Sequence, residues 1–258
     1  MCNPSRHFMS PNLTLQRITM FNKVTLTNKH ILTVSLLSAL VATSPAAYAQ
    51  ESDSLFSFSA NAAVVSDYRF RGISLSNRDF AIQGGLDIST KSGFYLGTWG
   101  SSIESYSGSE TELDIYGGYS GEVGALTYDV GLLAYTYPGS DGTAYLEGYA
   151  SLSGSAQKLD WTVGYAYAFN QDSIGGQDNS YIYLDTALPL GDTGLNLAGH
   201  IAYENGAFGD DKLDWSMGLT YPIGNFEAGI TYIDTNIENF GAKTIASGTV
   251  VFSLGASF

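Results

Sequence analysis

The chain has 258 residues and a formal net charge of −14, from 25 acidic and 11 basic side chains. This acidity excludes a nucleic-acid-binding protein, because phosphate contacts need a basic face. Aromatic residues make up 13% of the chain, and no apolar run reaches the roughly 20 residues of a spanning helix. Two classes of protein fit these properties: an outer-membrane β-barrel and a secreted acidic β-sandwich.

The N-terminal part of the chain has the order of a cleaved secretory signal peptide. Lys23 and Lys29 precede an apolar run over 31–42, and Ala47 and Ala49 then form a small-x-small cleavage site. The apolar run is well short of a spanning helix, which disfavours an uncleaved anchor. We therefore expect the protein to be exported.

Residues 1–49 are thus the predicted signal peptide, and residues 50–258 are the predicted mature domain. Met20 is the better start of the leader, because residues 1–19 are polar. Cys2, the only cysteine, and four of the 11 basic residues precede the cleavage site. The mature protein should therefore be more acidic than the whole chain. It should also lack a disulfide, and an exported protein whose sheet is closed needs no such cross-link.

One pattern repeats through the mature chain: an alternating segment of about ten residues, followed by a turn signal. Twelve segments fit it: 56–70, 80–89, 94–102, 111–120, 125–136, 144–152, 159–169, 180–188, 195–204, 213–221, 226–233 and 248–258. A tilted membrane strand needs about 9–11 residues, and an even strand number places both chain ends on the periplasmic side. The pattern predicts an all-β fold, a single transmembrane up-and-down antiparallel barrel of 12 strands.

The segment 159–169 shows the alternation clearly. One face carries Leu159, Trp161, Val163, Tyr165, Tyr167 and Phe169, and the other carries Asp160, Thr162, Gly164, Ala166 and Ala168. A soluble sandwich buries an apolar face and would show the same alternation. The small or polar opposite face and the many tyrosines favour lipid on the outside, because Tyr and Trp settle at membrane interfaces.

The connections between these segments alternate in length. After even-numbered segments they are short: 90–93, 121–124, 153–158, 189–194 and 222–225. After odd-numbered segments they are mostly longer and more polar: 72–79, 103–110, 138–143, 170–179, 205–212 and 234–247. Long external loops and short periplasmic turns are typical of outer-membrane barrels. A sandwich has no reason to keep this alternation, so the barrel is favoured.

The last segment ends on an aromatic residue. Phe252, Leu254 and Phe258 share its apolar face. Such endings resemble the C-terminal membrane-insertion signal of bacterial outer-membrane barrels, which the barrel-assembly machinery recognises. We expect this strand to close the barrel in the bacterial outer membrane, with lipid and lipopolysaccharide around it.

Four stretches resemble a known family. Residues 65–74 (VSDYRFRGIS), 93–101 (GFYLGTWGS), 112–119 (ELDIYGGY) and 135–139 (YTYPG) are similar to the TorF-family porins. The likeness covers most of the mature chain and is densest from residue 56 to 150. It implies an outer-membrane barrel with a porin role, and it identifies no substrate.

The alternation also predicts which charged side chains face the lumen, because residues two positions apart in a strand point to the same side. Asp67, Glu112, Asp114, Glu147, Glu204 and Asp214 are expected towards the external mouth, Asp185 near the middle, and Asp87, Asp129, Asp160 and Glu227 towards the periplasm. The expected inward bases are Arg69 and Arg71, near the external end. Carboxylates lower the energy of a cation in a narrow, low-dielectric passage. We predict a porin-like channel for passive diffusion of small solutes or ions, narrow and cation-preferring.

Other interpretations of these charges stay open. The carboxylates could only solvate the lumen wall or pair with the two arginines. Arg69 and Arg71 could form a constriction or anion-orienting site, or an internal salt-bridge network that fixes the first strand. Such a network could also plug the lumen of a barrel of this size. The protein would then be a non-conducting structural or adhesive barrel.

The mature chain offers no set of residues for catalysis. Its only histidine, His200, lies in mid-strand and faces inward with Asn196 and Glu204, whereas membrane-barrel hydrolases and acyltransferases use a Ser/His or His/Asp set. The loop runs 139–142 and 209–212 have too few ligands for a calcium loop. We expect no enzyme activity, no cofactor and no bound metal.

Overall fold

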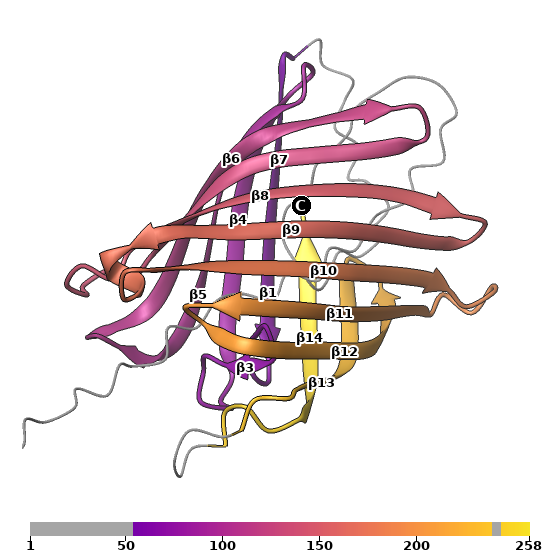
Figure 1. Cartoon of the computed structure of the whole chain (residues 1–258). Coiled ribbons are helices and arrows are strands. Elements are labelled where there is room, and N and C mark those ends of the chain that lie inside the picture. The colour runs from indigo at the N-terminus through magenta and orange to yellow at the C-terminus, as the bar shows by residue number, and fades with distance from the viewer. Residues whose placement is uncertain (1–53, 239–243) are drawn as a thin grey trace, which may run out of the picture.

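The structure is a computed structural model that describes residues 54–238 and 244–258 (Figure 1). Twelve antiparallel strands close into one barrel, and a two-stranded hairpin lies in the connection between the first two of them. The predicted leader, with its cleavage residues Ala47 and Ala49, lies outside the described residues. The all-β barrel that the alternating segments predict is confirmed.

Each barrel strand pairs with its neighbours in chain order, and β1 pairs with β14 to close the sheet. The strands are β1 (Phe56–Val65), β4 (Ala81–Thr90), β5 (Phe94–Tyr106), β6 (Ser109–Val123), β7 (Leu126–Thr136), β8 (Tyr145–Ala156), β9 (Leu159–Gln171), β10 (Gln177–Pro189), β11 (Asn196–Gly206), β12 (Gly209–Ile223), β13 (Phe226–Thr235) and β14 (Thr249–Ser257). A short 3-10 turn, η1 (Asp172–Ile174), precedes β10. Among the described residues, no helix is both long and apolar enough to cross a membrane.

The outward face of the barrel is apolar. Large side chains at alternating positions are exposed, for example Phe58 (76%), Ile82 (71%) and Met217 (63%). Exposing this surface to water would cost about 25 cal/mol per Å², whereas hydrocarbon tails solvate it well. The alternation that predicts a lipid-facing side therefore corresponds to the outside of the barrel.

The last strand closes the barrel beside the first. The Phe258 amide donates to the Ala60 carbonyl oxygen (2.8 Å), and the Ala60 amide donates to the Phe258 carbonyl oxygen (3.1 Å). Phe252, Leu254 and Phe258 are all exposed and lie on the outward face of the barrel. The closing strand is thus where the sequence predicts it, and its recognition by the barrel-assembly machinery stays a prediction.

The first strand is shorter than expected. The alternation predicts a strand over 56–70, but β1 ends at Val65. The chain then turns into the barrel, where β2 (Arg69–Phe70) and β3 (Ile73–Ser74) pair as a hairpin. Residues 69–74 are called the inner hairpin below, and the barrel end that they enter is called the hairpin end.

The turn of the inner hairpin explains why the strand stops. Arg71 has a φ of 44° and Gly72 a φ of 86°, a left-handed conformation that glycine adopts at little cost. Asp67, Arg69 and Arg71 therefore do not lie on the wall of the first strand, as the sequence predicts. They lie on a segment that folds back inside the barrel.

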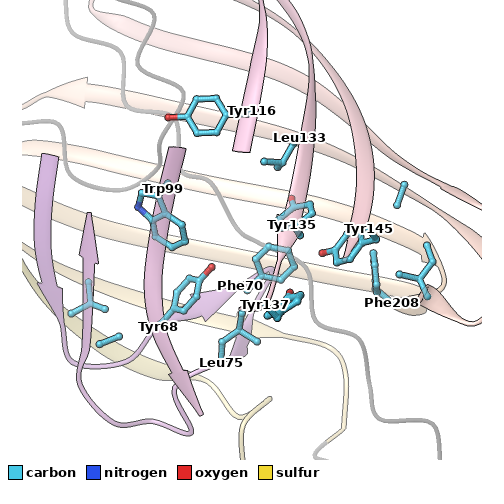
Figure 2. Packing of buried hydrophobic residues seen from close by; sticks show 14 of the residues in the cluster. Tyr68, Phe70, Leu75, Trp99, Tyr116, Leu133, Tyr135, Tyr137, Tyr145 and Phe208 are labelled. Carbon is cyan, nitrogen blue, oxygen red and sulfur yellow. The ribbon is translucent and has the colours of Figure 1, made fainter. Parts of the chain in front are cut away.

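The inner hairpin and the residues beside it pack on aromatic side chains of the wall (Figure 2). Tyr68 meets Trp99 edge-to-face with 5.5 Å between ring centroids, and Phe70 meets Tyr135 at 6.3 Å. Phe70 is wholly buried, which stabilises the docked hairpin by roughly 1.5–3 kcal/mol. The barrel thus has a hydrophobic core inside its hairpin end.

Candidate functional site

Arg71, at the tip of the inner hairpin, binds carboxylates on two wall strands. Its Nη1 donates to Glu204 Oε1 on β11 (2.5 Å), and its Nη2 donates to Glu147 Oε2 on β8 (2.8 Å). The guanidinium also lies 3.9 Å from the centroid of the Tyr181 ring on β10. Burial acts to lower the pKa of Arg71, but Glu147 and Glu204 outweigh it and hold the pKa above its ordinary value. The charged side chain therefore ties the hairpin to three strands.

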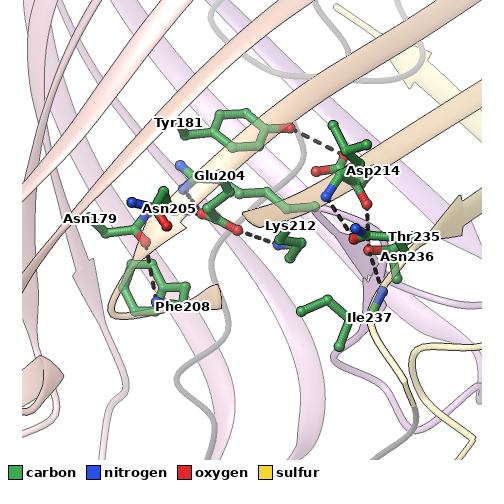
Figure 3. Close-up of polar contacts among 12 residues, drawn as sticks. Asn179, Tyr181, Glu204, Asn205, Phe208, Lys212, Asp214, Thr235, Asn236 and Ile237 are labelled. Atoms are coloured by element: carbon green, nitrogen blue, oxygen red, sulfur yellow. Dashed lines mark hydrogen bonds and ion pairs between the residues drawn. The ribbon is translucent and has the colours of Figure 1, made fainter. Parts of the chain in front are cut away.

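Glu204 is the centre of a buried polar network, part of which Figure 3 shows. It accepts hydrogen bonds from Asn179 Nδ2 (2.9 Å) and from Lys212 Nζ. Lys212 is an inward base that the sequence reasoning missed, because the alternation predicts a strand that begins at Leu213. The side chain has the same parity as Asp214, so extending the strand by one residue would have found it.

Asp67 and Arg69 bind each other and the last connection of the barrel. Arg69 Nε lies 2.6 Å from Asp67 Oδ2, and Ser74 Oγ donates to Asp67 Oδ1 (2.5 Å). Arg69 Nη1 donates to the carbonyl oxygens of Ile245 (2.9 Å) and Ser247 (3.0 Å). Residues 244–247, which lead into β14, therefore lie against the inner hairpin.

Glu112 and Asp114 lie on β6 next to the aromatic core. The Tyr68 hydroxyl donates to Glu112 Oε1 (3.2 Å). Burial, reinforced by the charges of Glu112 and Asp114, raises the pKa of Tyr68 well above its ordinary value, so the hydroxyl stays a donor. Both carboxylates are wholly buried. They are covered at the hairpin end and do not face open water.

His200 lies between two carboxylates deep in the barrel. Its Nδ1 is 2.5 Å from Asp185 Oδ1 and its Nε2 is 3.2 Å from Asp214 Oδ1. The Tyr181 hydroxyl is 3.0 Å from Nε2. An imidazole bound at both nitrogens is an ordered part of the wall and is poorly placed to act as a base on another molecule. Within residues 54–238 and 244–258, no group of three or more His, Cys, Asp and Glu side chains could hold a metal ion.

The four remaining acids lie away from the hairpin end. Three of them accept hydrogen bonds from hydroxyl groups: Asp87 from Tyr116 (2.5 Å), Asp129 from Tyr95 (2.6 Å) and Asp160 from Ser155. The fourth, Glu227, is buried. Asp67, Glu147 and Glu204 at the hairpin end thus pair with basic side chains, whereas Asp87, Asp129 and Asp160 accept hydrogen bonds from neutral hydroxyl groups. A role of the eleven acids in ion passage stays a prediction.

Inward tyrosines lie across glycines on neighbouring strands. An added Cβ would lie 2.2 Å from Tyr149 Oη at Gly131 and 2.1 Å from Tyr183 Cζ at Gly164. Two further rings lie in the same way, Tyr95 across Gly118 and Tyr116 across Gly97. A glycine lets a ring rest against the backbone. The sequence predicts tyrosines at the membrane interfaces. Inward acids two residues away in the same strands would assign Tyr116, Tyr149 and Tyr183 to the lumen, but the strand of Tyr95 carries no such acid.

Comparison with known proteins gives a family without a function. A family model described as "Bacterial protein of unknown function (Gcw_chp)" matches residues 49–258. No curated protein matches the sequence. The resemblance to TorF-family porins stays a prediction, because the matching model does not carry that name.

Several solved porin structures have a similar fold. A structure of the KdgM porin has a TM-score of 0.54 and 8% identity, and the match covers 78% of this chain and 98% of that chain. The NanC porin has a TM-score of 0.53 and 12% identity, with 78% and 99% covered. KdgM in complex with disordered oligogalacturonate has a TM-score of 0.52 and 8% identity, with 78% and 97% covered. At these identities the likeness shows the fold, which is the barrel of porins.

Proposed function

The chain belongs to the Gcw_chp family of bacterial proteins of unknown function, and we propose that it is a porin-like channel of the bacterial outer membrane. The observation that carries this proposal is a closed twelve-stranded barrel with an apolar outward face and charged inward side chains. The similar fold of the KdgM and NanC porins supports it. The hairpin end is then external, and the opposite end faces the periplasm.

We propose further that the channel prefers cations. Among residues 54–238 and 244–258, eleven inward acids stand against the inward bases Arg69, Arg71 and Lys212, and each of these bases pairs with an acid at the hairpin end. Beyond the hairpin, Asp87 and Asp129 accept hydrogen bonds from tyrosine hydroxyl groups, which bring no positive charge. A cation is stabilised by this field in a low-dielectric passage, and an anion is repelled.

The inner hairpin makes the passage narrow. Tyr68, Phe70 and Arg71 reach β5, β7, β8 and β11 from inside, so they occupy the lumen at the external end. Small solutes or ions would pass beside the hairpin or after its displacement. Wide passage, as in sixteen-stranded porins, is not expected from a barrel of this size.

Reversal potentials test the proposed selectivity. Refolded residues 50–258 in planar bilayers under a salt gradient should show discrete steps and a reversal potential of cationic sign. Asp129→Asn should shift that potential towards zero, since it removes an inward charge. Asp192→Asn, in an exposed turn at the periplasmic end, is the matched control and should leave it unchanged. Anion preference would reject the proposal.

A second function is favoured by the packing at the hairpin end. The buried ion pairs of Arg71 and the aromatic contacts of Tyr68 and Phe70 could hold the lumen shut. The protein would then be a non-conducting structural or adhesive barrel. Silence in bilayers from a demonstrably folded barrel would select this function.

A further inference from the structure

The turn between β11 and β12 carries a phenylalanine that folds into the barrel. We call residues 206–209 the Phe208 tip, a turn of two residues with a glycine on either side. Phe208 is 8% exposed, whereas Ser107 and Gly108, which form the turn between β5 and β6, are both exposed. Gly, Pro, Asn, Asp and Ser are the usual residues of such turns. The Phe208 ring therefore contributes to the inside of the barrel and not to the turn itself.

The ring of Phe208 stands at one end of a row of aromatic rings (Figure 2). It packs on Tyr145, the first residue of β8, with 5.4 Å between ring centroids. Tyr145 stacks on Tyr135 of β7 at 4.5 Å, and Tyr135 meets Phe70 of the inner hairpin at 6.3 Å. The row therefore joins the Phe208 tip to the inner hairpin across the hairpin end of the barrel.

The wall beside this row has little bulk of its own. The inward residues of β9 towards the hairpin end are Ala166 and Ala168. Ala168 is wholly buried and belongs to the same apolar cluster as Tyr145 and Phe208. An alanine side chain is too short to fill the lumen beside it. Closure of the barrel along β9 therefore depends on side chains that reach over from other elements, Phe208 among them.

Hydrogen bonds to β10 hold the Phe208 tip in place. The Ala207 amide donates to the Asp178 carbonyl oxygen (2.9 Å), and the Phe208 amide donates to Asn179 Oδ1 (3.1 Å), the second of which Figure 3 shows. Gly206 has a φ of 130°, a conformation that glycine adopts readily, and the register between β11 and β12 shifts just before it. With a second glycine at its other end, the tip can turn about two residues of high backbone freedom.

The elements on either side of the tip are anchored more firmly. The inner hairpin is bound to β8 and β11 by the ion pairs of Arg71. The connection before β10, which carries the buried Ile174, is tied to β8 because Gln171 exchanges two hydrogen bonds with the Leu146 backbone (2.8 and 2.9 Å). Segments with few such contacts are the first to open locally. The Phe208 tip is therefore the part of this closure that moves most readily.

We propose that the Phe208 tip is the gate of the external mouth. It opens by swinging about its two glycines, which withdraws the Phe208 ring from Tyr145 while the inner hairpin stays docked. Hinges of this kind need only a few residues to absorb the change in backbone angles. The role as a gate rests on the proposed channel function, whereas the movement of the tip does not require conduction.

Hydrogen exchange of the refolded mature protein in detergent tests the movement without any variant. Relative to the unfolded chain, the amides of Ala207 and Phe208 should exchange at least about tenfold faster than those of Ser74 and Leu75. The latter two amides are bonded to carbonyl oxygens beside the inner hairpin. Equal protection of the two pairs, or faster exchange at Ser74 and Leu75, would overturn the tip as the moving part.

Single-channel recording of Phe208→Ala tests the gate. The ring makes apolar contacts in the closed state that it loses in the open state, so removing it should raise the ratio of open to closed time at least about tenfold. The size of each step should not change, because the inner hairpin still sets the width of the passage. Ile174→Ala, which removes a buried side chain of the same cluster from the anchored connection, is the matched control and should leave the ratio nearly unchanged.

The outcomes separate the gate from the channel. Steps from the wild type with an unchanged ratio in Phe208→Ala would overturn the gate and keep the channel. An equal rise in Ile174→Ala, or larger steps in Phe208→Ala, would also overturn the gate, because the packing as a whole and not the tip would then control the passage. Silence of every folded barrel would reject the channel and the gate together.

Discussion

Gly72 turns the inner hairpin where it meets the barrel wall. Its φ of 86° suits glycine, and an added Cβ would lie 2.7 Å from Thr235 Cβ and 3.1 Å from Asp214 Cβ. Gly72→Ala is expected to lower the free energy of unfolding by about 3 kcal/mol, through backbone strain and overpacking. Urea unfolding of the refolded barrel in detergent measures this loss.

The matched control for that substitution is Gly142→Ala. Gly142 also has a positive φ, 67°, but nothing lies within 4 Å of an added Cβ. Its substitution should cost only the backbone strain, about 1 kcal/mol. Equal losses at the two glycines would contradict close docking of the hairpin on the wall.

Arg71 should matter far more to stability than the neighbouring Arg78. Arg71→Met leaves Glu147 and Glu204 buried without the guanidinium that joins them, and removing one partner of a buried charge network costs about 3–5 kcal/mol. Arg78 is exposed and bonds to the oxygens of Thr244, so Arg78→Met should cost less than about 0.5 kcal/mol. The same urea titration compares them, and similar losses would show that the Arg71 contacts do not hold the hairpin.

The face of each inward residue could be predicted, but its partners could not. Glu147 and Asp185 alternate with apolar outward neighbours, so their inward parity is visible in the sequence. The bond between Glu147 and Arg71 spans 76 positions and depends on the path of the inner hairpin, which no local pattern encodes. The inward positions of Tyr149 and Tyr183 were missed because aromatic residues are expected at the membrane interfaces.

At the scale of elements, the strands were predicted well because lipid on one side enforces a two-residue period. The strands on either side of 103–110 and 205–212 run further than predicted and leave turns of two residues, 107–108 and 207–208. The larger exception is the end of β1. Asp67, Arg69 and Arg71 continue the alternation of that strand, so its end at Val65 leaves no break in the pattern. The signal that was available is Gly72, a residue suited to the left-handed turn that reverses the chain inside the barrel.

The closing strand carries a prediction about assembly. Phe258 ends the chain in hydrogen bonds with Ala60 and has an exposed ring. If the assembly machinery recognises this terminus, Phe258→Ser should lower the amount of folded barrel in the outer membrane several-fold. Gel mobility of unheated membrane samples separates folded from unfolded protein. Phe58→Ser, an equally exposed residue on the adjacent strand, is the control, and equal loss in both variants would refute a special role of the terminus.

At the scale of the whole molecule, the barrel has two unlike halves. The hairpin end is filled by aromatic packing and by the ion pairs of Arg69, Arg71 and Lys212. The other half has acids bound to hydroxyl groups and tyrosines that are partly exposed. In the channel that we propose, the first half would set the width of the passage and the second half the sign of the ions that pass.

Single-channel conductance of a hairpin replacement tests this account most directly. Residues 69–74 would be exchanged for a glycine-serine segment of equal length, and the same exchange at 138–143, in the connection between β7 and β8, would serve as the control. The account predicts small cation-preferring steps for the wild type and the control. It predicts steps several-fold larger, with cation preference retained, for the hairpin variant. Unchanged conductance after hairpin replacement, or silence from every folded barrel, would contradict it.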